Sequence, residues 1–376
     1  MSADGPASPG SAPQGACVGS ARRMRLSVLG DLPTLFPLSQ NHAFQPALLT
    51  PGAGAVDDLS LLRVMGFGST TALPRLDNPA LKGAKWAELL NHCHSIGMQV
   101  LLGMAPSSQV PFADAKPFRE WLFIHPKPDF EAFAQRLKAI ADSDLPGWAG
   151  VNFDIEYIFG RVGDADLGHK RTRLADFYKT VAKVIAPKIV AVVAGAKISN
   201  DHVYHHLDSD GTEQVPAFQA SDAALLHDWR EITRDASGAL VPNILMRAMA
   251  YDGEPLGGAP ALLRWHDQTI HYATDAPPNG VGLPEAQYQL IIKIAKSGPK
   301  PNQPGMVTDS SGIQLRASLA RTHRVGLALF PMVKQEDWGS IDARLNRKHG
   351  APAAGTCSRQ PSQLPIDDLA GSLAPV

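Results

Sequence analysis

Three polar side chains alternate with apolar ones in the segment GVNFDIEYIF, residues 150–159. Asn152, Asp154 and Glu156 occupy every second position. In a β-strand such residues point to the same face, about 6–7 Å apart. Two buried carboxyl groups at this spacing do not both ionise easily, so we expect one member of the pair to have a raised pKa. A protonated glutamic acid suits general acid catalysis of glycosidic bond cleavage.

The segments on either side alternate between strand and helix patterns. Strands are predicted over 24–30, 61–69, 98–105, 150–158, 188–195, 242–252 and 324–332, with a weak eighth near 304–309. Helices are predicted over 84–97, 129–142, 174–185, 285–298 and 312–323. The helix over 129–142 places Phe130, Phe133, Leu137 and Ile140 on one face, and Gly97 is a suitable C-terminal cap for the helix before it.

This alternation predicts parallel βαβ units, and eight of them form a (β/α)8 TIM barrel, here with a seventh strand that could be irregular. An open doubly wound sheet is the alternative, but it would usually show a Gly-rich turn after its first strand, and none follows 24–30. Strands of a parallel sheet are normally apolar on both faces. The polar face of 150–156 therefore points into the barrel, with Glu156 at the carboxyl-terminal mouth where barrel active sites lie.

The stretch AGVNFDIE, residues 149–156, resembles the DxxDxDxE signature of family-18 glycoside hydrolases, the chitinase family. By this resemblance Glu156 is the catalytic acid/base and Asp154 orients the substrate's 2-acetamido group. Asn152 takes the place of the Asp that modulates the pair. Ala149 stands where the signature has its first, supporting Asp.

A second segment, MAYD at 249–252, resembles the family's motif on the sixth strand. The resemblance makes Tyr251 a partner of the acetamido carbonyl, with Asp252 lining the same subsite. Alternation places Arg247, Met249 and Tyr251 on one inward face, so Met249 and Arg247 are weaker candidates for lining the subsite. The family's last strand ends in a Trp that supports the sugar. Phe330 occupies this place here, with Trp338 following on the loop.

The resemblance implies a substrate-assisted retaining mechanism on a β-linked N-acetylglucosamine glycan. The substrates it leaves open are chitin or chitooligosaccharide, peptidoglycan, and the core of an N-glycan. It implies no metal and no organic cofactor. A non-catalytic glycan-binding barrel is the second hypothesis. A metal-dependent barrel hydrolase is the third, but His92 and His94 face apart on a helix, and the pair His202 and His206 has no HExxH glutamate.

The remaining features of the 376-residue chain are unremarkable for a globular protein. Its net charge of −1 and its three scattered cysteines give no indication of nucleic-acid binding, an anionic membrane surface or a disulfide framework. Ala/Gly/Pro/Ser-rich tails are predicted over 1–23 and 349–376, flanking a catalytic barrel over 24–348. No signal peptide is recognised, so we expect a protein that is cytoplasmic as synthesised or exported by a non-classical route. Trp229 and Trp338 are the best candidates for sugar stacking, and the oligomeric state is left open.

Overall fold

The computed structural model describes residues 25–50, 56–67, 73–105, 117–126, 128–155, 158, 163–198, 223–250, 258–293, 316 and 318–330. Its strands are β1 (Leu26–Asp31), β2 (Asp58–Phe67), β3 (Pro74–Leu76), β4 (Gln99–Met104), β5 (Gly150–Asp154), β6 (Ile189–Gly195), β7 (Ile244–Met249), β8 (Tyr288–Lys293) and β9 (Gly326–Phe330). Its α-helices are α1 (Leu32–Leu35), α2 (Ala84–Ser95), α4 (Phe130–Asp144), α5 (Leu167–Ile185), α6 (Ala223–Leu226), α7 (Trp229–Thr233) and α8 (Gly258–Thr274). Residues 316 and 318–322 are also helical.

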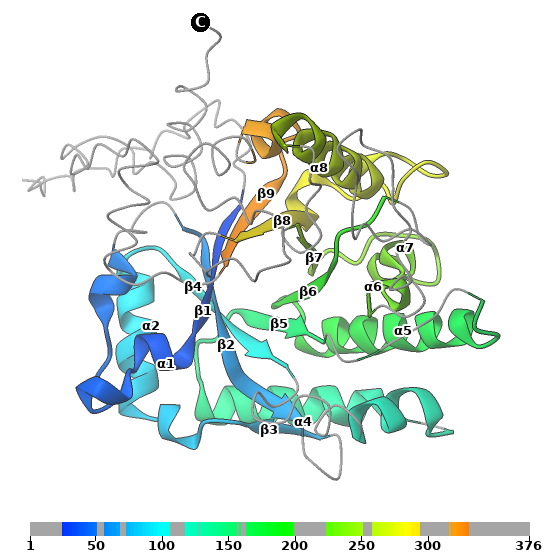
Figure 1. Cartoon of the computed structure of the whole chain (residues 1–376). Coiled ribbons are helices and arrows are strands. Elements are labelled where there is room, and N and C mark those ends of the chain that lie inside the picture. Colours follow the sequence, from blue (N-terminus) through cyan, green and yellow to red (C-terminus); the bar gives the residue numbers. More distant parts are fainter. Residues whose placement is uncertain are drawn as a thin grey trace, which may run out of the picture.

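The strands form a closed parallel barrel (Figure 1). Each of the eight parallel strands pairs with its neighbours in the order β1, β2, β4, β5, β6, β7, β8 and β9, and β1 pairs with both β9 and β2. β3 is a short antiparallel addition to β2. The chain therefore folds as a (β/α)8 TIM barrel, as the alternation of strand and helix patterns predicted.

Long amphipathic helices cover the outside of the barrel (Figure 1). In α4 the predicted apolar face is observed, with Phe133 and Leu137 buried and Phe130 and Ile140 packed against the core. The side chain of Asp129 caps the helix by accepting a hydrogen bond of 2.8 Å from the amide of Ala132. α2 ends as predicted, since Gly97 follows it with a left-handed φ of 81°.

The prediction of a helix over 285–298 was wrong, because residues 288–293 form strand β8. This seventh strand of the barrel pairs in regular register with β7 and β9, so it is not irregular over the described residues. Tyr288, Leu290 and Ile292 pack on the helix side, while Gln289 and Ile291 face the barrel interior. The weak strand near 304–309 lies outside the described residues, and β8 completes the barrel without it.

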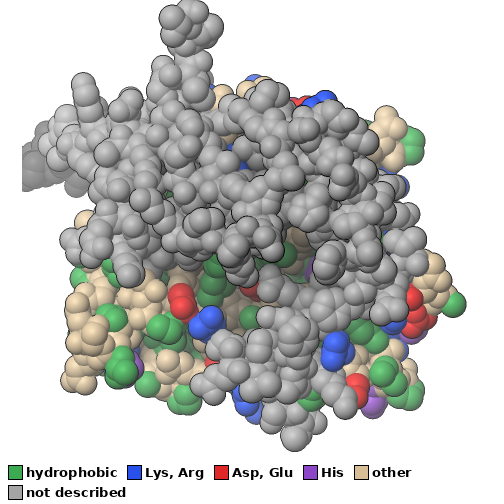
Figure 2. Space-filling view, in the orientation of Figure 1, with side chains coloured by type: hydrophobic (Ala, Val, Ile, Leu, Met, Phe, Trp, Pro, Cys, Tyr) green, Lys and Arg blue, Asp and Glu red, His purple; other side chains and the backbone are tan. Residues whose placement is uncertain are grey.

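Charged side chains of both signs are scattered over the visible described surface in Figure 2. Among the described helices, none is both long and apolar enough to cross a membrane.

Candidate functional site

The inward face of β5 carries the first two of the predicted site residues. Asn152 is fully buried inside the barrel, and Asp154 is the half-buried last residue of the strand. Val151 and Phe153 point the opposite way into the main core, where the ring of Phe153 packs edge-on against Phe177 of α5 at 5.4 Å. The predicted division of this strand into an apolar outer face and a polar inner face is confirmed for residues 151–154.

Arg247 of β7 lies at the centre of the barrel, fully buried. Its guanidinium has five N–H donors, and each is matched by a hydrogen bond. Nε donates to Gln289 Oε1 at 2.7 Å, and Nη1 donates to Ser60 Oγ at 2.5 Å and to Asn152 Oδ1 at 2.7 Å. Nη2 donates to Ser27 Oγ at 2.9 Å and to Asp58 Oδ1 at 2.8 Å. Arg247 therefore holds the barrel strands together and has no donor left for a substrate.

Asp58 of β2 balances the charge of Arg247. Burial by itself would raise the pKa of the Asp58 carboxyl, but Arg25, Arg247 and the hydroxyl of Ser27 together lower that pKa below its usual value. Arg25 Nε donates to Asp58 Oδ2 at 2.7 Å, and the Ser27 hydroxyl donates to the same oxygen at 2.7 Å. The buried carboxylate is thus ionised and fully engaged by the two arginines and the serine.

Sequence reasoning missed most of this polar layer. The second strand was predicted to begin at Leu61, so Asp58 and Ser60 were left outside it, whereas β2 begins at Asp58. Gln289 fell in the segment predicted as a helix. The signal that could have revealed the layer is the polar residue at every second position of DLS, residues 58–60, which resembles the alternation in β5.

Apolar layers lie on both sides of the polar one, below it towards the amino ends of the strands and above it towards their carboxyl ends. Below it, Leu101, Ala191 and Leu245 form a small cluster against which Ala149 packs. An aspartate at position 149 would enter this apolar layer, and this agrees with the departure from the family signature there. Above it, at the carboxyl ends of the strands, Met249 and Phe330 pack in one cluster with Leu29, Val193, Ile291 and Ala328.

Two predicted substrate-binding residues, Met249 and Phe330, are thus brought together at the barrel mouth. Both are only partly buried, so each retains some exposed surface. Their cluster lies one layer nearer the mouth than Arg247.

Behind the end of β5, the charge of Asp154 reaches a second polar group. Burial of Tyr178 on α5 raises the pKa of its hydroxyl well above the usual value, and the nearby negative charge of Asp154 raises it further. The Tyr178 hydroxyl shares a hydrogen bond of 3.1 Å with Nε2 of His227. The backbone carbonyl of His227 accepts a hydrogen bond of 2.7 Å from Nζ of Lys197. The tyrosine is therefore neutral, and its hydroxyl joins the polar groups between β6 and α7.

The other predicted site residues lie outside the described residues: Glu156, Tyr251, Asp252 and Trp338. Their roles stay predictions, as does the raised pKa expected for one of the two carboxyl groups. Trp229 was wrongly considered for sugar stacking, because its ring is fully buried between α7 and the barrel, 5.7 Å from that of Tyr288. His92, weighed for metal binding, lies edge-on to Phe44 at 5.6 Å.

Known proteins resemble this chain in structure and not in sequence. No protein-family model matches it, and no curated protein matches its sequence. The C-terminal domain of a chitinase candidate from Desulfitobacterium hafniense DCB-2 matches with a TM-score of 0.57 and 14% identity, over 86% of this chain and 98% of that one. The spore cortex-lytic enzyme SleL of Bacillus megaterium QM B1551 matches with a TM-score of 0.52 and 12% identity, over 86% of this chain and 75% of that one.

A third match is the chitinase-like agglutinin RobpsCRA from Robinia pseudoacacia, with a TM-score of 0.50 and 10% identity, over 84% of this chain and 98% of that one. The fold is chitinase-like. This agrees with the resemblance found in the sequence. Because at least one protein with this fold is described as an agglutinin, the chitinase-like barrel does not by itself establish hydrolysis.

Proposed function

We propose that the protein is a glycoside hydrolase that cleaves a β-linked glycan containing N-acetylglucosamine. The observation that carries this proposal is the orientation of β5. The strand directs Asn152 and then Asp154 into the barrel and ends at its carboxyl-terminal mouth. Glu156 follows Asp154 by two residues, so continued alternation would place its carboxyl at the mouth, where barrel enzymes carry out their chemistry.

In the proposed reaction the substrate's own acetamido oxygen attacks the anomeric carbon while Glu156 protonates the leaving oxygen. Asp154 and Tyr251 hold the acetamido group and offset the positive charge of the oxazolinium intermediate. Glu156 then activates the water that opens it. This substrate-assisted route is one of the exceptions to the two-carboxylate scheme.

Asn152 fits a modulating role beside this pair. Its Oδ1 accepts the hydrogen bond from Arg247, which fixes the orientation of the amide. Its Nδ2 has no hydrogen-bond partner within the described part of the chain, so one donor on the inward face of β5 is free to interact there. Met249, Asp252, Phe330 and Trp338 are proposed to line the sugar subsite.

The substrate class is tested with fluorogenic chitobiose and chitotriose and with peptidoglycan, because the structural matches include both a chitinase candidate and a spore cortex-lytic enzyme. We expect the wild type to act on at least one of them. Glu156→Gln should lower kcat by about 10²–10⁴-fold, the usual contribution of a general acid or base. The control is Glu88→Gln, the same substitution at an exposed position of α2.

A wild type that is inactive on all these substrates would contradict the hydrolase proposal, and a fully active Glu156→Gln would contradict the assignment of the acid. The second candidate function is glycan binding without turnover, favoured by the match to a chitinase-like agglutinin. It predicts that chitooligosaccharides bind in calorimetry to the wild type and to Glu156→Gln alike, with no hydrolysis by either.

A further inference from the structure

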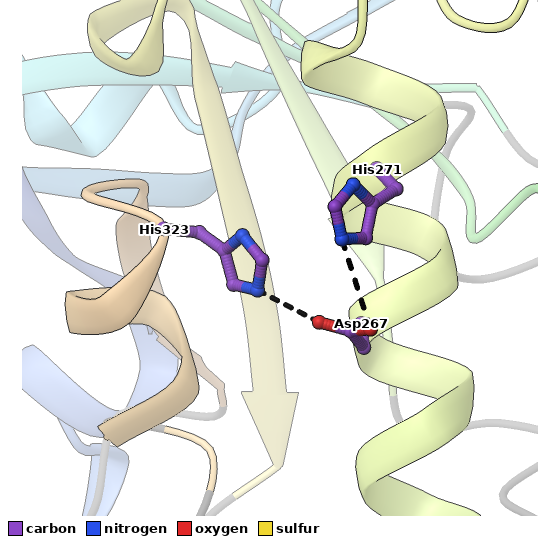
Figure 3. Close-up of side chains that lie close together, drawn as sticks. All are labelled: Asp267, His271 and His323. Atoms are coloured by element: carbon purple, nitrogen blue, oxygen red, sulfur yellow. Dashed lines mark hydrogen bonds and ion pairs between the residues drawn. The ribbon is translucent and has the colours of Figure 1, made fainter.

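Two histidines and an aspartate converge on the outside of the barrel, between α8 and the turn that leads into β9 (Figure 3). Asp267 and His271 lie one turn apart on α8, so they share a face of that helix. His323 follows the last described helical turn and lies three residues before β9. Residues far apart in the sequence are therefore brought to one point by the packing of two neighbouring units.

The three side chains direct ligand atoms at one another. His323 Nε2 lies 2.7 Å from Asp267 Oδ1, and His271 Nε2 lies 3.8 Å from Asp267 Oδ2. One ligand atom from each residue lies within 4.8 Å of the other two. Atoms bound to zinc at about 2.0–2.2 Å in a tetrahedral site are about 3.4 Å apart. Small rotations of these partly exposed side chains would bring the ligand atoms to that spacing, by lengthening the 2.7 Å distance from Asp267 to His323 and shortening the 3.8 Å distance to His271.

A second carboxylate orients His271. Its Nδ1 lies 3.1 Å from Asp275 Oδ1, and since a carboxylate accepts, Nδ1–H donates. In the neutral ring this leaves the lone pair on Nε2, the atom that faces Asp267. Metal-binding histidines commonly have such a carboxylate partner on their other nitrogen. Two carboxylates and two imidazoles within one cluster also attract a positive charge.

We propose that Asp267, His271 and His323 bind a divalent transition-metal ion, with Zn²⁺ the best match to two imidazole nitrogens and one carboxylate oxygen. Half of the His271 side chain is exposed, so water would complete the coordination. The ion would fasten α8 to the turn before β9. Because His323 lies where a strand begins, the site is on the face opposite to the catalytic mouth, where barrels are stabilised.

The test titrates Zn²⁺ into the full-length, chelator-treated protein by calorimetry. The wild type should bind one equivalent more than His271→Gln, and Zn²⁺ should raise the Tm of the wild type more than that of the variant. His94→Gln, an exposed histidine on α2, should behave like the wild type. Asp275→Asn keeps all three ligands, and we expect it to weaken binding by about 10–100-fold.

Equal Zn²⁺ stoichiometry and affinity in the wild type and His271→Gln would overturn the proposal, and the cluster would then be a set of hydrogen-bonded histidines and aspartates without a metal ion. His271 is exposed enough for the substitution to be compatible with folding, and the Tm of each chelated variant checks this. The proposal is independent of the proposed hydrolase function, because the variants should not change turnover at the opposite face.

Discussion

At the scale of single residues, Arg247 donates five hydrogen bonds inside the barrel. It was considered from sequence as a residue that could line the sugar subsite. The structure instead satisfies all five of its donors with groups from β1, β2, β5 and β8. One of these acceptors is Asn152, so the same arginine holds the inward face of the strand that ends at Asp154.

We predict that Arg247→Met strongly destabilises the protein. Removing one partner leaves the buried Asp58 carboxylate with less compensation and leaves several buried acceptors without donors, which typically costs about 3–5 kcal/mol. The free energy of unfolding in urea measures the effect. Arg75→Met is the matched control, because Arg75 forms a partly exposed ion pair with Asp77 and should cost no more than about 1 kcal/mol. An Arg247→Met variant as stable as the control would contradict the central role of the network.

At the scale of elements, β5 depends on a glycine for its close pairing with β6. A Cβ at Gly150 would overlap the carbonyl oxygen of Ile189 and lie 2.8 Å from its amide nitrogen. Both atoms belong to the backbone of the neighbouring strand, so a side chain at position 150 cannot be accommodated by a change of rotamer. The strand that carries Asn152 and Asp154 can therefore pair closely with β6 because residue 150 has no side chain.

We predict that Gly150→Ala lowers the free energy of unfolding by about 1–3 kcal/mol, the usual cost of overpacking. Gly168→Ala is the control. Gly168 lies in the first turn of α5 with open space around the added methyl group, so this substitution should be neutral or stabilising by up to about 1 kcal/mol. Thermal and urea unfolding compare the two variants. Equal effects would mean that the contact with Ile189 relaxes at little cost.

The misassigned β8 is also understood at this scale. Its sequence, YQLIIK, is apolar on the helix side and mixed on the barrel side. Neither the two-residue period of a strand nor the 3.6-residue period of a helix therefore dominates the pattern. A short apolar run of this kind is compatible with a buried strand or a buried helix until its neighbours are known. Hydrogen-bonded pairing with β7 and β9 makes this segment a strand.

At the scale of the whole molecule, closure of the barrel makes every parallel strand an interior one. β9 is the strand that closes it, since it pairs with β1 on one side and β8 on the other. Closure also separates the two faces of the molecule. The proposed reaction belongs to the carboxyl ends of the strands, and the proposed metal site belongs to the opposite ends.

We predict that a chain comprising residues 24–348 melts within a few degrees of the full-length protein, because the predicted catalytic barrel lies within these bounds. A chain that ends at Arg324 lacks β9 and leaves β1 and β8 as open edges, so it should not fold cooperatively. Circular dichroism melting compares the three chains. If the chain over 24–348 unfolds, the segments beyond it contribute to the barrel and the predicted domain bounds are wrong.

The sequence by itself determined the class of fold and the face of β5 that enters the barrel. Hydrophobic periodicity is a local property, and alternation in residues 150–156 requires no knowledge of distant residues. The tertiary structure alone decided which polar residues meet. Asp58 and Arg247 are 189 residues apart, and Asp267 and His323 are 56 residues apart. Such pairs depend on strand register and helix packing, which arise only when the barrel closes.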